Sequence, residues 1–88
     1  MSEGDLRQGL REFISHELLM DETAVLDDDQ ELLLDGTIDS LGATRLVGHI
    51  EGTWSIKIPP EDVTVENFRT IATMAGYVER RVVDGSGP

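Results

Sequence analysis

Residues 35–54 read DGTIDSLGATRLVGHIEGTW, an acidic turn that runs directly into an amphipathic segment. Apolar side chains recur in this segment at steps of three and four residues, the spacing of one helix face. They are Ala43, Leu46, Val47, Ile50 and Trp54. Asp39 or Ser40 stands where an N-cap belongs, because a side-chain oxygen there accepts a backbone N–H of the first turn. We therefore predict a helix from about Ser40 to Thr53.

Two further segments on either side of this helix show the same helical spacing. Upstream, Leu6, Leu10, Phe13, Ile14 and Leu18 predict a helix from about Asp5 to Met20. Downstream, Phe68, Ile71, Ala72, Ala75, Val78 and Val82 predict a helix from about Val65 to Arg81, with Thr64 as its cap. Between the second and last helices, Pro60 to Thr64 is expected to form a short helical turn that begins at Pro60.

A long acidic loop is predicted between the first two helices. From Asp21 to Asp39 the chain has eight carboxylates and neither Lys nor Arg, so charge repulsion disfavours a regular helix there. The apolar residues of this segment show no sustained period, and the leucines among them are expected to hold the loop against the core. The apolar residues are Val25, Leu26, Leu32, Leu33, Leu34 and Ile38. Asp27 to Asp29 lack the glycine and ligand spacing of a calcium loop, so we interpret them as a solvated acidic face.

These elements predict an all-α fold, a small four-helix bundle with three main helices, a short third helix and one long loop between the first two. One domain is expected over residues 1–83, followed by a disordered tail over residues 84–88. The chain has 88 residues and no cysteine, so the core must be held by packing without disulfides or thiolate-bound metal.

The charge balance indicates the kind of partner. Eighteen acidic and seven basic residues give a formal net charge of −11, which repels nucleic acid and anionic lipid and favours proteins with basic surfaces. The chain shows neither a signal peptide nor an apolar run long enough for a membrane span, so a cytoplasmic location is expected.

Ser40 is the residue best placed to carry chemistry, and three roles are open to it. As an N-cap it would only satisfy a backbone N–H. As an enzymatic nucleophile it would need a base, but His49 lies nine positions along the same helix, about 13 Å away at about 1.5 Å per residue. Ile38 also occupies the position where a nucleophile elbow requires glycine, and His16 is better explained as a surface residue. The third role is a site of covalent modification.

The modification role agrees with a resemblance that extends over most of the chain. The sequence Asp39-Ser40-Leu41, followed by Leu46-Val47, Trp54, Ile58-Pro59 and Tyr77-Val78, resembles the acyl, aminoacyl and peptidyl carrier proteins. The resemblance implies a four-helix bundle that is not an enzyme. It also implies that a separate phosphopantetheinyl transferase moves 4′-phosphopantetheine from coenzyme A to the serine of this motif, Ser40. The thiol of that arm then holds a substrate as a thioester.

The same resemblance implies the partners. They are the transferase, an adenylating acyl or aminoacyl ligase, and a downstream transferase or synthase, with a monomeric carrier and no nucleic acid or membrane. Asp39 is expected either to cap the helix or to present its carboxylate to the transferase or its metal. No metal site is expected in the chain itself.

The predicted helix after Ser40 departs from carriers of fatty-acid synthesis, which usually present several acidic residues there. Its exposed positions are nearly neutral. We therefore expect a dedicated pathway partner with a different surface charge. The residues expected to contact it are Leu41, Thr44, Arg45, Gly48 and Val63. The cargo stays open between acyl, aminoacyl and peptidyl groups, and the alternative function is an acidic helical adaptor that never receives the arm.

Overall fold

The computed structural model describes residues 3–83, and all the regular structure in this range is helical. Helix α1 spans Glu3–Phe13 and continues as a π-helical turn over Ile14–Leu18. Helices α2, α3 and α4 span Ser40–Trp54, Val65–Phe68 and Ile71–Val83, with a 3-10 turn at Pro60–Asp62. The predicted all-α bundle is therefore confirmed, whereas the tail predicted over residues 84–88 lies outside the described residues.

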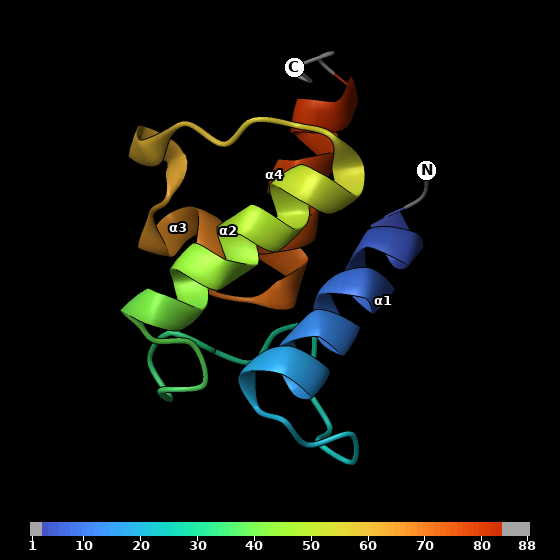
Figure 1. Cartoon of the computed structure of the whole chain (residues 1–88), viewed down its shortest axis with the longest axis vertical. Coiled ribbons are helices and arrows are strands. Elements are labelled where there is room, and N and C mark those ends of the chain that lie inside the picture. The colour runs from blue at the N-terminus through green and yellow to red at the C-terminus, as the bar shows by residue number, and fades with distance from the viewer. Residues whose placement is uncertain (1–2, 84–88) are drawn as a thin grey trace.

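The core lies between α1, α2 and α4. Helix α1 packs along α4, and α2 crosses in front of α4 in the view of Figure 1. Each helix contributes fully buried side chains at helical spacing. They are Leu6, Leu10 and Ile14 from the first helix, Leu46 and Ile50 from α2, and Ile71, Met74 and Val78 from α4. Across the described range, no helix combines the length and the apolar character that crossing a membrane requires.

The first helix starts and ends about two residues earlier than the predicted Asp5 to Met20. Its last turn widens, because the amide of Leu19 donates to the carbonyl of Ile14 at 2.9 Å. Met20 then adopts a left-handed conformation with φ of 55°, and the amide of Asp21 donates back to the carbonyl of Ser15. This reversal of the backbone ends the helix, although Met20 fits its hydrophobic pattern.

The helix predicted from Val65 to Arg81 is wrong as a single element, because it is broken between α3 and α4. Thr70 and Thr73 exchange bonds at the break: each hydroxyl accepts the other residue's amide, at 3.0 and 3.1 Å. The two threonines thereby cap α4. The predicted cap of α3 is confirmed, since the Thr64 hydroxyl accepts the amide of Asn67.

The long loop over residues 19–39 forms hydrogen bonds with the backbone on both sides of this break. The amide of Leu32 donates to the carbonyl of Arg69, and the amide of Ala72 donates to the carbonyl of Asp28. Leu26 and Leu32 are buried, as predicted for the leucines that hold the loop against the core, and Ile38 is buried as well. Leu34 differs from that prediction, because its side chain is exposed. The loop is thus irregular but anchored at defined points.

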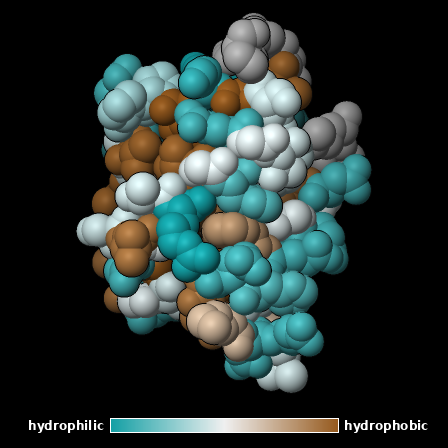
Figure 2. Space-filling model, viewed as in Figure 1, coloured by the Kyte–Doolittle hydropathy of each residue, from teal (hydrophilic) through white to brown (hydrophobic). Residues whose placement is uncertain are grey.

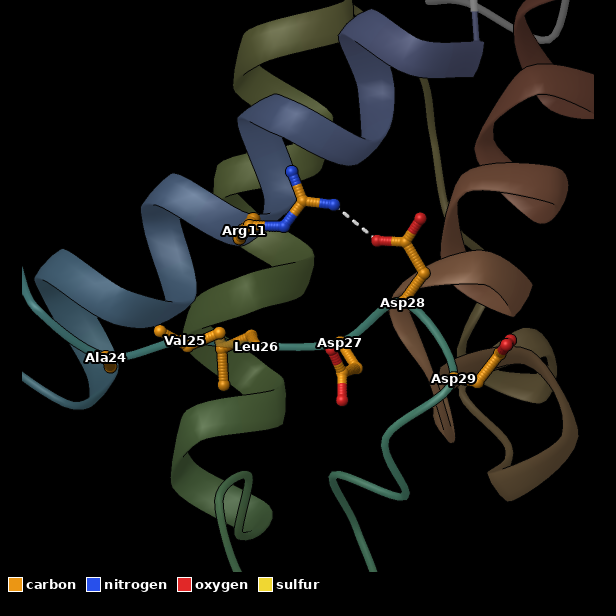
Figure 3. A pocket seen from close by; sticks show the side chains of 7 residues that line it. All are labelled: Arg11, Ala24, Val25, Leu26, Asp27, Asp28 and Asp29. Atoms are coloured by element: carbon orange, nitrogen blue, oxygen red, sulfur yellow. Dashed lines mark hydrogen bonds and ion pairs between the residues drawn. The ribbon is translucent and has the colours of Figure 1, made fainter.

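Asp28 is also part of this anchor, which corrects the prediction that Asp27 to Asp29 form only a solvated acidic face. Figure 3 shows Arg11 reaching from α1 toward Asp28 on the loop. Arg7 binds the other carboxylate oxygen of Asp28 at 2.7 Å. These two guanidinium groups hold the pKa of Asp28 below its usual value, Arg7 having the larger effect. Asp27 and Asp29 are exposed, as expected.

Asp62 connects the 3-10 turn to the rest of the bundle. Its carboxylate accepts the hydroxyl of Tyr77 at 2.6 Å, and its carbonyl accepts the side-chain amide of Asn67 at 2.9 Å. Burial of the phenol and the hydrogen bond to Asp62 raise the pKa of Tyr77 to about 12.

We expect the only tyrosine of the chain to ionise well above pH 10 while the protein stays folded. The folded state favours the neutral phenol. Its contribution to stability is therefore complete below pH 10 and is lost as the pH rises toward 12. Tyrosinate absorbance and far-ultraviolet circular dichroism, followed together across this range, measure ionisation and folding. Asp62→Asn is expected to lower the pKa of Tyr77 partway, since burial remains. Titration of the folded wild type near pH 10 would contradict this assignment.

Candidate functional site

Ser40 occupies the first position of α2, and its side chain is exposed. The N-cap is Asp39, whose Oδ1 accepts the amide of Gly42 at 2.7 Å. The interpretation of Ser40 itself as the cap is therefore wrong, whereas the capping role predicted for Asp39 is confirmed. Within residues 3–83 the Ser40 hydroxyl has no hydrogen-bond partner, so it is available to another molecule.

A tight turn brings the chain to this position. Gly36 has a positive φ of 83°, and the Asp35 carboxylate accepts the amide of Thr37 at 2.8 Å. Ile38 is then buried, which fixes the point where the chain enters α2. Asp39 is extended, and its carbonyl accepts the amide of Ala43 as the first bond of the helix. The turn and the buried isoleucine thus place Ser40 at the surface.

The surroundings of Ser40 do not form an enzymatic nucleophile site. Both histidines line a groove between α1 and α2 that excludes Ser40, and the ring of His49 stacks on Phe13 at 4.1 Å. The side chains over residues 3–83 offer no group of three or more potential metal ligands of the His, Cys, Asp or Glu type. Ser40 does fit an anionic substituent, because the first amides and the dipole of a 15-residue helix stabilise negative charge at its start.

A groove of about 370 Å³ opens beside Ser40, between the start of α2 and the segment leading into α3. Its lining is mainly apolar, and hydrophobic surface gathers on this side of the molecule in Figure 2. The apolar lining residues are Leu33, Ile38, Ala43, Val63, Val65 and Phe68. Of these, sequence reasoning placed only Val63 near the site. Val65 is 62% exposed and was missed, since it was interpreted only as the start of a helix.

The residues predicted to contact a partner lie on two sides of Ser40. Leu41 is 70% exposed and lines a smaller hollow together with Arg45. Thr44 and Gly48 are exposed farther along α2. Arg45 lies near Glu17 of the first helix, with 3.9 Å between nitrogen and oxygen. Both side chains are exposed, so this pair contributes little to stability.

Two glycines of α2 differ in what surrounds them. A Cβ at Gly48 would meet no heavy atom within 4 Å, whereas one at Gly42 would lie 3.2 Å from Oδ1 of Asp39. Gly48→Ala is therefore expected to raise the free energy of unfolding by about 1 kcal/mol, the gain in helix propensity. Gly42→Ala is expected to gain less or to lose stability, because it displaces the cap. Urea unfolding of both variants measures the difference, and equal gains would contradict it.

Comparison with known proteins gives the family. The family model described as a phosphopantetheine attachment site matches residues 8–78. An acyl carrier protein of Kineococcus radiotolerans is 33% identical over 79 residues, covering 90% of this chain and 94% of that protein. A D-alanyl carrier protein of Lactococcus lactis is 31% identical over 55 residues, covering 62% of this chain and 70% of that protein. A chain from a crystal structure described as that of an FAD-dependent dehydrogenase superposes with a TM-score of 0.72 at 33% identity, covering 78% of this chain and 97% of that one.

The matched model extends from α1 into α4, and it describes the attachment of phosphopantetheine. Members of this family are carriers and not enzymes. Their covalent cofactor, 4′-phosphopantetheine, supplies the thiol that this cysteine-free chain lacks. The chain belongs to the phosphopantetheine-binding carrier proteins.

Proposed function

We propose that Ser40 is the residue that holds the 4′-phosphopantetheine, and that the chain presents acyl, aminoacyl or peptidyl thioesters to the enzymes of a biosynthetic pathway. The observation that carries this proposal is the free and exposed hydroxyl of Ser40 at the first position of α2. Asp39 takes over the capping role, so modification of Ser40 leaves the helix start intact.

The attachment reaction requires only the hydroxyl of Ser40 from this chain. The Oγ of Ser40 forms a bond to the phosphorus of coenzyme A that carries the pantetheine, and the bond from that phosphorus to 3′,5′-ADP breaks. The hydroxyl proton passes to a base of the phosphopantetheinyl transferase. A transferase that brings its own base and metal explains why Ser40 needs no histidine beside it.

Within this function, we propose an aminoacyl cargo over the acyl cargo for which the longer-matching relative is named. The exposed face of α2 bears Arg45 and glycines where an acidic docking face would be expected of a fatty-acid carrier, and one relative is a D-alanyl carrier protein. The match takes in 97% of the crystal chain but 78% of this one, and the crystal structure is named for an FAD-dependent dehydrogenase. An enzyme of that class, which oxidises a substrate held on the arm, is therefore a candidate downstream partner.

The other proposed partners are the phosphopantetheinyl transferase, an adenylating ligase that loads the arm, and a transferase or synthase that unloads it. The proposed contact residues are exposed on the surface that includes Ser40. They are Leu41, Thr44, Arg45, Gly48 and Val63. A monomeric state and a cytoplasmic location stay predictions from the sequence.

The test is a mass measurement on the full apo chain. After incubation with coenzyme A and a broad-specificity transferase, we expect the intact mass to rise by one phosphopantetheine, and fragmentation of the labelled peptide to assign it to Ser40. No gain in mass would exclude the carrier function and favour the adaptor. Adenylating ligases for amino acids are then expected to load the holo-protein. Efficient loading and extension by fatty-acid enzymes instead would exclude the aminoacyl cargo.

A further inference from the structure

The groove between α1 and α2 that both histidines line has a volume of about 480 Å³, and Ser40 is not among its lining residues. Its walls come from the first helix on one side and from the second half of α2 on the other. Gly9 at one end contributes no side chain, and a Cβ there would lie 3.1 Å from the indole of Trp54. The glycine therefore lets the indole of Trp54 approach α1 closely beside the groove.

The groove has an aromatic lining. The rings of Phe13 and His49 stack with 18° between their planes, and the edge of Trp54 approaches His49 with 6.0 Å between ring centres. Phe13 and His49 are half-buried and both line the groove. The two rings cover each other's facing surfaces, so a planar group that enters the groove can stack only against an outer face of the pair.

The same groove bears two carboxylates, Glu12 and Glu17. The carboxylate of Glu12 accepts the neutral side-chain amide of Gln8 at 2.9 Å. Arg45 donates to the backbone carbonyl of Glu17 at 3.3 Å and lies 3.9 Å from its carboxylate, so the charge of Glu17 is partly balanced and that of Glu12 is not paired with a cation in the described range. Burial holds the pKa of His49 below its usual value, so this ring adds no positive charge near neutral pH. The side of the molecule where α1 lies is hydrophilic in Figure 2.

We propose that this groove binds an arginine side chain of a partner protein that docks along α2. The inference rests on the proposed carrier function, to which it adds a contact surface on α1. A guanidinium group is planar and delocalised, so it stacks on an outer face of the Phe13–His49 pair while its N–H groups pair with the carboxylates of Glu12 and Glu17. A lysine ammonium matches the charge but lacks the flat face.

The adjacent face of α2 permits the approach that this contact needs. A Cβ at Gly48 or Gly52 would meet no heavy atom within 4 Å, so the surface beside the groove is low and unobstructed. Charge complementarity also gives a role to the first helix. The acidic surface that a basic partner requires is absent from the exposed face of α2 but is present across the groove, on α1.

The test uses the nitrogen-15-labelled full apo chain and a capped Ala-Arg-Ala peptide, with Ala-citrulline-Ala and Ala-Lys-Ala as matched probes. We expect the arginine peptide to shift the amides that line the groove and the indole N–H of Trp54. The citrulline peptide, which keeps the shape but not the charge, is expected to cause no such shift. The lysine peptide is expected to bind more weakly than the arginine peptide.

Glu12→Gln with Glu17→Gln is expected to weaken binding of the arginine peptide about fivefold or more. The control is Glu61→Gln with Glu66→Gln, which removes the same charge from the exposed surface near α3 and is expected to leave binding unchanged. Shifts spread over the whole surface, equal weakening in both double variants, or equal binding of arginine and lysine would overturn the proposal. Because the apo chain is used without coenzyme A, this outcome is independent of the mass gain at Ser40.

Discussion

Ser40→Ala is expected to abolish phosphopantetheine attachment completely while leaving the free energy of unfolding within about 0.5 kcal/mol of the wild type. The hydroxyl is the proposed acceptor, so its removal leaves no group for the transferase to modify. Its side chain is exposed and bonded to nothing in the described range, and alanine is favoured in helices. Intact mass after incubation with coenzyme A and transferase measures the first effect, and urea unfolding measures the second.

Asp39→Ala is a control in which stability is expected to fall while the acceptor hydroxyl is kept. Asp39→Ala removes the carboxylate that caps α2 and is expected to cost about 1 kcal/mol of stability, although Ser40 remains. Modification of Ser40→Ala, or an unfolded Ser40→Ala protein, would contradict the assignment of Ser40 as an acceptor without a structural role.

Asp39→Asn separates the two roles considered for the carboxylate. Asparagine caps a helix about as well as aspartate, so this variant is expected to keep its stability. A slower transfer reaction in Asp39→Asn would then assign the charge of Asp39 to the transferase or its metal. An unchanged rate would leave Asp39 with the capping role alone.

The sequence predicts helices well where the hydrophobic period and the caps agree. The start of α2 was predicted correctly, because Asp39 and the spacing of Leu46 and Ile50 give the same boundary. The break between α3 and α4 was not predicted, because Phe68, Ile71 and Ala75 keep a helical spacing across it. The break is held by the bonds that Thr70 and Thr73 exchange and by bonds to Leu32 and Asp28, about 40 residues away. Hydrophobic periodicity contains no information about either set.

At the candidate site, too, local motifs could be predicted from the sequence, whereas contacts between distant residues could not. Ser40 and Asp39 were recognised from adjacent residues in the sequence, which is where motifs are visible. The groove beside Ser40 was missed because it joins Leu33, Ala43 and Val65, which are distant in the sequence and meet only in the folded chain. Asp28 was likewise interpreted as solvated, since its partners Arg7 and Arg11 lie on another element.

Leu32→Ala is expected to lower the free energy of unfolding by about 3 kcal/mol, as much as a leucine in the centre of a helix bundle. Leu32 lies in the long loop, yet its side chain is fully buried and part of the core. Its amide also bonds to Arg69 at the break between α3 and α4, so a cavity here loosens the contact that shapes α3. Urea unfolding followed by circular dichroism measures the loss.

Leu34→Ala is the matched control, two residues away in the same loop. The Leu34 side chain is 79% exposed, so its truncation is expected to change stability by less than about 0.5 kcal/mol. If the two variants lost the same small amount, the loop would not be anchored through Leu32. A large loss in Leu32→Ala alone would show that an acidic loop without regular structure stabilises the bundle as a helix does, through one buried leucine held at the end of α3.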